Sequence, residues 1–158
     1  MIRTHRRLEP LLFALLLSAS VVVSGCGIVS TSAPAPTPED FQGIAAEIVS
    51  RGIVIDHLVS GDAGCMDHTL IQTAIAFDAK GLGQDTPVPL HIYIFRDDDA
   101  YARLRSSIDD CVADYMTDAS TFESIDDSPF VLAGQGPWSP AFEAALREAL
   151  DVAAGAGD

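Results

Sequence analysis

Basic residues are scarce in this chain of 158 residues. It contains nine lysines and arginines against 23 aspartates and glutamates, and its formal net charge is −14. Lys80 is the single lysine. A surface with such an excess of negative charge is repelled by phosphate backbones and by anionic lipid headgroups. The composition therefore excludes a nucleic-acid-binding role and favours cations or basic proteins as partners.

Several motifs of enzymes and ligand-binding loops are also missing. The chain has no Gly-x-Ser-x-Gly elbow of the serine hydrolases and no EF-hand spacing of calcium ligands. Gly81-Leu82-Gly83 could suggest a phosphate-binding loop, but Pro87 and Pro89 follow where a helix would have to begin. The run Asp97-Asp98-Asp99 is explained more simply by helix capping than by calcium binding. The sequence thus argues against nucleotide binding and serine hydrolysis.

No hydrophobic run is long enough to cross a membrane as a helix. The apolar stretch at 11–23 has 13 residues, whereas a transmembrane helix needs roughly 20. Prolines at 34, 36 and 38 prevent a helical continuation, because proline lacks the backbone donor. The stretch follows three arginines and ends in Val23-Ser24-Gly25-Cys26.

This N-terminal pattern resembles the signal peptide of bacterial lipoproteins. The resemblance implies that residues 1–25 are removed, that the Cys26 thiol is lipidated, and that the mature chain is anchored at the extracytoplasmic face of a cell membrane. Removal of residues 1–25 takes away three positive charges and one negative charge, so the formal net charge falls from −14 to −16. Residues 26–36, rich in Ser, Ala and Pro, are expected to form a tether, and residues 37–158 a single small globular domain.

Two cysteines remain beside the anchor, Cys65 and Cys111. In an oxidising compartment such a pair usually forms a disulfide. A metal–thiolate or redox pair is the alternative, but the chain lacks the Cys-x-x-Cys spacing and a zinc-finger pattern of histidines. The sequence therefore predicts a Cys65–Cys111 disulfide.

The pattern of apolar residues predicts the order α-β-β-β-α-β-α. Thr37 and Pro38 are expected to start the first helix, which ends before Gly52, and Asp97 is expected to cap a helix that runs to Tyr115. Strands are predicted at 53–60, 69–77, 90–95 and 130–133, and a last helix from residue 139. Three consecutive strands joined by turns favour an antiparallel meander. The predicted fold is an α+β two-layer sandwich, with a mainly antiparallel four-stranded sheet and the helices on one face.

Three histidines of the domain, His57, His68 and His91, lie on or beside predicted strands, and aspartates precede the first two. Imidazole and carboxylate groups suit zinc or copper. Strand alternation argues against convergence, because His57 has the parity of Ile55 whereas His91 alternates with its apolar neighbours. These histidines are therefore weak candidates for metal ligands, and the sequence specifies no cofactor.

Trp138, the sole tryptophan, follows the glycine-rich segment that contains Gln135. A loop of this kind can recognise a ligand, which makes Gln135 and Trp138 weak ligand-binding candidates. The alternative prediction is that Trp138 closes one end of the core.

Two functional hypotheses remain. The first is a non-enzymatic binding module whose acidic surface docks a basic protein or a cell-envelope component. The second is a small metal-binding or enzymatic domain that uses the three histidines and nearby aspartates.

Overall fold

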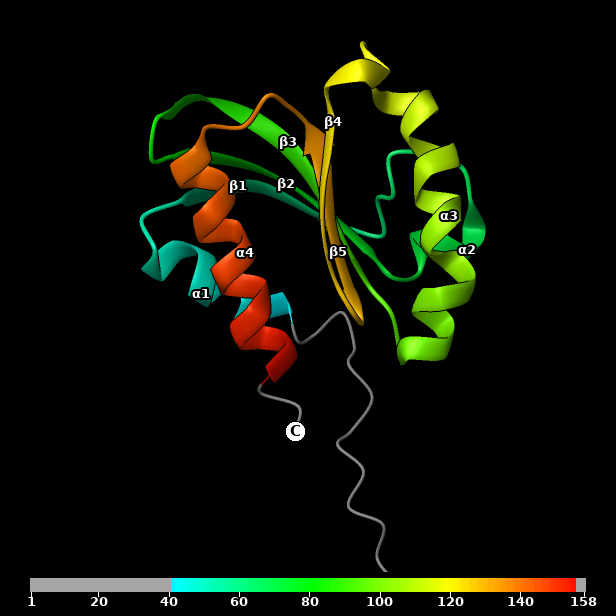
Figure 1. Ribbon diagram of the computed structural model, residues 1–158. Helices are drawn as coiled ribbons and strands as arrows, with labels where there is room; N and C mark the ends of the chain where they lie inside the picture. The colour runs from blue at the N-terminus through cyan, green and yellow to red at the C-terminus, as the bar shows by residue number, and fades with distance from the viewer. Residues whose placement is uncertain (1–40, 156–158) are drawn as a thin grey trace, which may run out of the picture. The chain divides into compact units, whose positions relative to one another are not determined.

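The computed structural model describes residues 41–155, so Cys26, the 26–36 tether and the predicted cap Thr37 lie outside the described part. An antiparallel sheet of five strands forms its centre, with the strand order β1-β2-β3-β5-β4 (Figure 1). In chain order the elements are α1 (Phe41–Ser50), β1 (Val54–Ser60), α2 (His68–Ile71), β2 (Ala74–Gly81), β3 (Gln84–Ile94), α3 (Asp98–Tyr115), the short 3-10 helix η2 (Ala119–Thr121), β4 (Phe122–Asp127), β5 (Phe130–Gln135) and α4 (Pro140–Gly155).

The α+β class and the antiparallel meander are confirmed. The strands β1, β2 and β3 are consecutive antiparallel neighbours, and β5 pairs antiparallel with both β3 and β4. The chain passes from β3 through α3 to β4 and then returns along β5, which lies between β3 and β4. The predicted number of four strands and the predicted element order are wrong.

Helices cover both faces of the sheet, not one face as predicted. In Figure 1, α1 and α4 lie on one side of the strands, and α3 lies on the other side with α2. The reason is visible in β3, where five consecutive residues, Leu90 to Ile94, are buried. Successive side chains of a strand point to opposite faces of the sheet. A strand in which five consecutive side chains are buried therefore needs apolar cover on both faces.

The first apolar core lies between the sheet and the pair α1 and α4. Phe41, Ile44 and Ile48 recur at helical spacing on α1 and are buried there. The buried stripe predicted on the last helix is also present, formed by Phe142, Ala145, Leu146, Ala149 and Leu150. These residues pack on strand side chains of one parity, which include Phe77, Leu90, Ile92 and Leu132.

The second core lies under α3. Tyr93 and Phe95 of β3, Val131 of β5 and Ile108 of α3 belong to it. Asp97 caps the helix as predicted, because its Oδ1 accepts a hydrogen bond of 2.7 Å from the backbone amide of Ala100. This bond lowers the pKa of the Asp97 carboxyl, which favours the charged form at the positive end of the helix.

Two segments differ from their predicted structure. The strand predicted at 69–77 begins as the short helix α2, because Asp67 accepts a bond of 2.8 Å from the amide of Thr69, and β2 starts only at Ala74. β4 was not predicted at all. Its sequence contains only two large apolar residues, Phe122 and Ile125, and reads as polar surface.

The strand β3 also begins earlier than predicted, at Gln84, and includes Pro87 and Pro89. These prolines lie before Leu90, where the pairing of β3 with β5 begins. This part of β3 pairs only with β2, so a residue without an amide donor is tolerated there.

The predicted disulfide is present. Cys65, in the loop between β1 and α2, is bonded to Cys111 of α3, and their Cα atoms are 5.5 Å apart. Cys111 is buried in the second core, as its place on the apolar stripe indicated. The bond therefore ties the loop after β1 to the helix that covers this face.

Removal of the disulfide should destabilise the domain substantially. The bond joins residues 46 positions apart, for which the loss of chain entropy in the unfolded state amounts to about 4 kcal/mol. We expect the Cys65→Ala, Cys111→Ala double variant to unfold at a clearly lower urea concentration than the oxidised chain. Reduced wild type should unfold close to the double variant; equal midpoints for the oxidised and reduced chains would contradict the expectation.

Candidate functional site

Part of the sheet face that α3 covers is open to solvent. Ala74, Tyr93 and Ala133 of this face are buried under α3 and the disulfide loop. On the edge strand β1 the cover ends: Val54 is 54% exposed and Val59 is 49% exposed. Register places Lys80 and Asp78 of β2 beside Val54 and Asp56 of β1. This open area, at the β1 side of the sheet, is the candidate site.

A bulge shapes the edge of this area. The regular register ends at Asp56 and resumes at Val59, and His57 has a left-handed backbone with φ of 51°. The Oδ1 atom of Asp56 accepts a hydrogen bond of 2.8 Å from the backbone amide of His57. The bulge changes which residues face α3, because Asp56 and Val59 both lie on that face.

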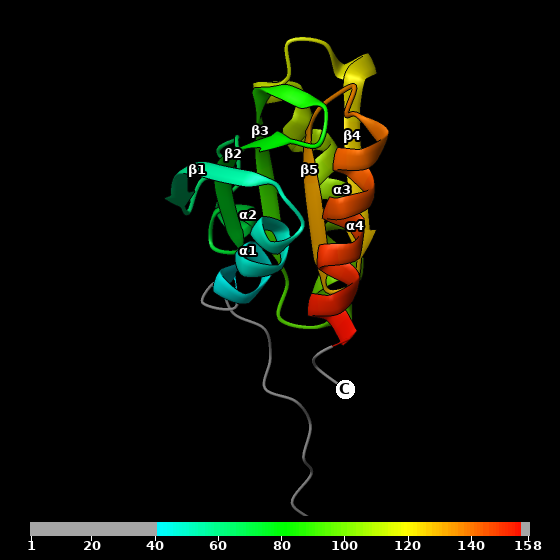
Figure 2. The same ribbon diagram turned by 90° about the vertical axis from the view of Figure 1, so that its left-hand side faces the viewer.

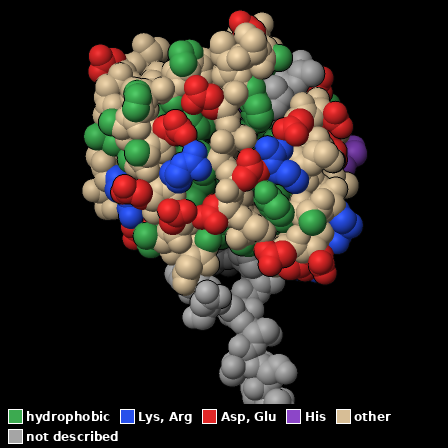
Figure 3. Space-filling view, in the orientation of Figure 1, with side chains coloured by type: hydrophobic (Ala, Val, Ile, Leu, Met, Phe, Trp, Pro, Cys, Tyr) green, Lys and Arg blue, Asp and Glu red, His purple; other side chains and the backbone are tan. Residues whose placement is uncertain are grey.

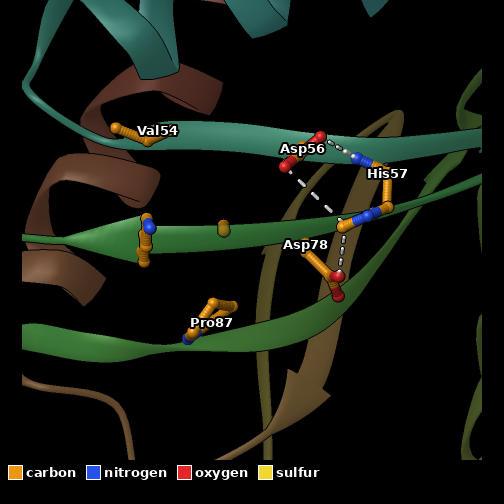
Figure 4. A pocket seen from close by; sticks show the side chains of 7 residues that line it. Val54, Asp56, His57, Asp78 and Pro87 are labelled. Carbon is orange, nitrogen blue, oxygen red and sulfur yellow. Dashed lines mark hydrogen bonds and ion pairs between the residues drawn. The ribbon is translucent and has the colours of Figure 1, made fainter.

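Two carboxylates and one imidazole meet at the bulge. Asp56 and Asp78 are Cα partners on neighbouring strands, so their side chains lie side by side on one face. The His57 ring bends toward them, with its Nδ1 3.0 Å from Asp78 Oδ2 and 3.8 Å from Asp56 Oδ2 (Figure 4). His57 and Asp56 are about three-quarters exposed, whereas Asp78 is 35% exposed.

These side chains line a shallow hollow of about 70 Å³ that is open to solvent. We call it the β1 hollow; it is lined by Val54, Asp56, His57, Asp78, Ala79, Lys80 and Pro87. Pockets that enclose small molecules usually have about 300–1,000 Å³. The β1 hollow is well below this range and open, so it can take the end of a partner's side chain but cannot enclose a substrate.

His91 lies deeper on the same face and is buried, with 6% exposure. Its ring packs on the Tyr115 ring at the end of α3, with 4.6 Å between centroids. Its Nε2 is 3.9 Å from Asp62 Oδ1, and its Nδ1 has no hydrogen-bond partner among residues 41–155. Burial lowers the pKa of His91, an effect that the Asp62 carboxylate only partly offsets.

The disulfide loop closes over this histidine. Gly64 has a φ of 75°, and its Cα lies against the Tyr115 ring, where an added Cβ would overlap. The Tyr93 hydroxyl donates a hydrogen bond of 2.9 Å to the Ala63 carbonyl oxygen, which holds the loop onto β3. His91 is thus a packed core residue beneath a fixed loop.

The three histidines do not form a metal site in the described part. His57 is exposed on β1, His68 is the first residue of α2, and His91 is buried on β3. Within residues 41–155, no three His, Cys, Asp or Glu side chains group as ligands for a metal ion. The regular alternation of side chains that was expected along β1 was wrong, because the bulge at His57 interrupts it.

The predicted core role of Trp138 is confirmed. Trp138 is 6% exposed and packs edge-on against Phe142. Its Nε1 donates a hydrogen bond of 3.1 Å to the Gln135 carbonyl oxygen. The Gln135 side chain hydrogen-bonds Thr117 at 3.0 Å. Both weak ligand-binding candidates therefore have structural contacts.

The position of Asp78 beside Asp56 does not follow from the spacing of residues in the sequence. Asp56 and Asp78 are separated by a turn, a helix and half a strand, so no local pattern joins them. The alternation of β2, Ala74 to Lys80, does show that Asp78 points away from Phe77 and Ala79. Its pairing with Asp56 depends on the register of β1 and β2.

Comparisons of the chain with protein-family models, with curated proteins and with solved structures gave no significant match. Among the helices of residues 41–155, none has the length and apolar character of a membrane span. The functional argument therefore depends on the geometry of the chain itself.

His91 should make the stability of the domain depend on pH. Its pKa is lowered from 6.5 in the folded state, so below about pH 6.5 the unfolded chain binds a proton that the folded chain does not. The unfolding free energy should therefore fall with decreasing pH, by up to about 1.4 kcal/mol per pH unit between the two pKa values. Urea unfolding at several values between about pH 5 and pH 7.5 measures this slope without titrating most carboxylates.

The variant His91→Phe tests the assignment, because it keeps an aromatic ring against Tyr115 and removes the titrating group. Its unfolding free energy should change less with pH than that of wild type. Val59→Thr, at an exposed position of β1, removes no titrating group, so it serves as the control and should keep the wild-type slope. If the unfolding free energy of His91→Phe changes with pH as much as that of wild type, His91 is not the cause of the pH dependence.

Proposed function

We propose that this chain is a lipid-anchored extracytoplasmic lipoprotein whose domain binds a basic partner in the cell envelope. Two parts of the chain support the proposal. The segment Val23-Ser24-Gly25-Cys26 supports the anchor, and Cys26 lies outside the described residues. The β1 hollow, with Asp56 and Asp78 side by side, supports the binding of a cationic group.

The paired carboxylates are the observation that carries the binding role. Like charges directly opposite each other on neighbouring strands destabilise a sheet. His57 provides one nearby nitrogen, and Lys80 is the one lysine at this surface. A lysine or arginine side chain of a partner, inserted between the two carboxylates, would relieve their repulsion and gain charge-assisted hydrogen bonds.

The wider surface supports the same class of partner. Figure 3 shows more acidic than basic side chains on the face seen in Figure 1, although basic side chains also lie near the centre of that face. Asp62 and Asp85 are exposed near the ends of β1 and at the start of β3, and add negative charge around the β1 hollow. A field of this sign accelerates encounter with a cationic partner, and salt screens it.

The metal-binding or enzymatic alternative has less support, because it needs the three histidines to converge. His91 is enclosed by Tyr115 and the disulfide loop, and His57 contacts only aspartates. We therefore retain the binding module as the proposed function.

The anchor is tested by replacing its cysteine. In a bacterial host fed labelled palmitate, the wild-type chain should incorporate label and fractionate with membranes, because two or three acyl chains hold a protein durably. Cys26→Ala should lose the label, whereas the Cys65→Ala, Cys111→Ala double variant should keep it. Label in Cys26→Ala would contradict lipidation at this residue.

The binding site is tested with poly-lysine as a cationic probe. Affinity of the full chain for poly-lysine should fall as salt rises from about 50 mM to about 300 mM, because exposed charges are screened. Asp56→Asn, Asp78→Asn should weaken binding about fivefold, as expected for two exposed ion pairs.

A matched control separates the site from total charge. Asp110→Asn, Asp114→Asn removes the same charge from exposed positions on α3. Equal losses in the two double variants would show that overall charge, and not the β1 hollow, determines the binding.

A further inference from the structure

The outer edge of β1 is open. β1 is the first strand in the order β1-β2-β3-β5-β4, and within residues 41–155 it pairs with β2 alone. Figure 2 shows β1 at the margin of the sheet. Six of its seven residues are exposed, and only Ile55 packs against the core. Among the described residues, the backbone groups of β1 that point away from β2 have no strand partner, although the His57 amide is bonded to the Asp56 side chain.

The side chains of the opposite edge strand, β4, are held by contacts within the domain. On β4, Asp126 forms an ion pair with Arg105 of α3 and accepts a hydrogen bond of 3.3 Å from Tyr101. Glu123 accepts a bond of 3.1 Å from the Trp138 amide. The two edges thus differ, and β1 is the one that presents exposed apolar side chains: Val54, Leu58 and Val59 are each about half exposed.

The common protections of an edge strand are only partly present in β1. The strand contains neither lysine nor proline, which natural proteins often place on edges. The bulge at His57 divides it, but the segment Val54–Asp56 keeps a regular register against β2. This segment is long enough to start pairing with an extended chain, and the bulge limits how far the pairing extends.

The charges beside this edge select the sequence of an added strand. Neighbouring strands lie about 4.8 Å apart, so a side chain of the added strand would contact Asp56 directly, and a long one would reach Asp78 about 10 Å away. Lysine and arginine have the length and the charge for both contacts. The alternate side chains of the added strand would lie on the other face, beside Ile55, which packs against the apolar core.

A second copy of this chain does not fit the same edge. Two copies of β1 that pair with Asp56 opposite Asp56 would bring these side chains together, and in any register both copies are strongly negative. Like charges facing each other across an added strand are destabilising. The charge distribution therefore favours a different, basic polypeptide.

We infer that an extended segment of a partner protein, with lysine or arginine alternating with apolar residues, adds as a strand to the outer edge of β1. This inference rests on the proposed function, and it specifies how the basic partner is bound. Backbone hydrogen bonds to β1 supply the pairing, and the cationic side chains occupy the β1 hollow between Asp56 and Asp78.

The experiment compares two peptides of equal charge. The first is an extended peptide in which lysine alternates with valine, and the second is the same peptide N-methylated at alternate residues, prepared in both registers. The full chain, purified in mild detergent, should bind the first peptide roughly tenfold or more tightly, because methylation removes backbone donors. Amide hydrogen exchange of residues 54–60 should slow when the first peptide is added.

The other outcomes separate this inference from the proposed function. Equal affinity for the methylated and unmethylated peptides, with losses in Asp56→Asn, Asp78→Asn, overturns strand addition and leaves a site that binds cationic side chains. Failure of the alternating peptide to bind, while poly-lysine still depends on the two aspartates, also overturns strand addition alone. If neither poly-lysine nor the alternating peptide binds less tightly to Asp56→Asn, Asp78→Asn, both strand addition and the proposed binding site are overturned.

Discussion

The burial of β3 on both faces is the constraint on which the rest of the structure depends. Leu90, Ile92 and Ile94 pack toward α1 and α4, and Tyr93 and Phe95 pack toward α3. One layer of helices could not exclude water from both sets. Both cores, the position of α3 and the need to hold α3 in place follow from this one strand. The disulfide and the Arg105–Asp126 ion pair are two of the contacts that hold it.

The same strand explains where the candidate site lies. Before Leu90, β3 loses its apolar pattern and its second neighbour, and Pro87 and Pro89 take the positions that face α3. Fewer large apolar side chains lie there for a helix to bury, and the cover ends. β1 and β2 extend into this uncovered area with Asp56 and Asp78, which makes it both accessible and negatively charged.

Much of the fold was predictable because it is encoded locally. The cap at Asp97, the apolar stripes of α3 and α4 and the strand at β1 were all visible within short windows. The disulfide followed from having only two cysteines to pair. β4 was missed because an edge strand needs few apolar residues when polar contacts hold it, here the Arg105–Asp126 ion pair and the hydrogen bond from the Trp138 amide to Glu123. Cover on both faces was missed because a continuous apolar run does not show how many layers enclose it. The pairing of Asp56 with Asp78 requires the register between strands, which no local pattern supplies.

The disulfide has a consequence for when the chain can fold. On the export route proposed above, the polypeptide crosses the membrane before it meets an oxidising environment. Domains of this size are stable by only about 5–15 kcal/mol, and this bond contributes about 4 kcal/mol. While Cys65 and Cys111 are reduced, the loop after β1 is not fixed to α3, and much of that margin is missing. The newly made chain would therefore unfold more readily inside the cell, which favours threading through a translocation channel, and would gain its full stability only after export.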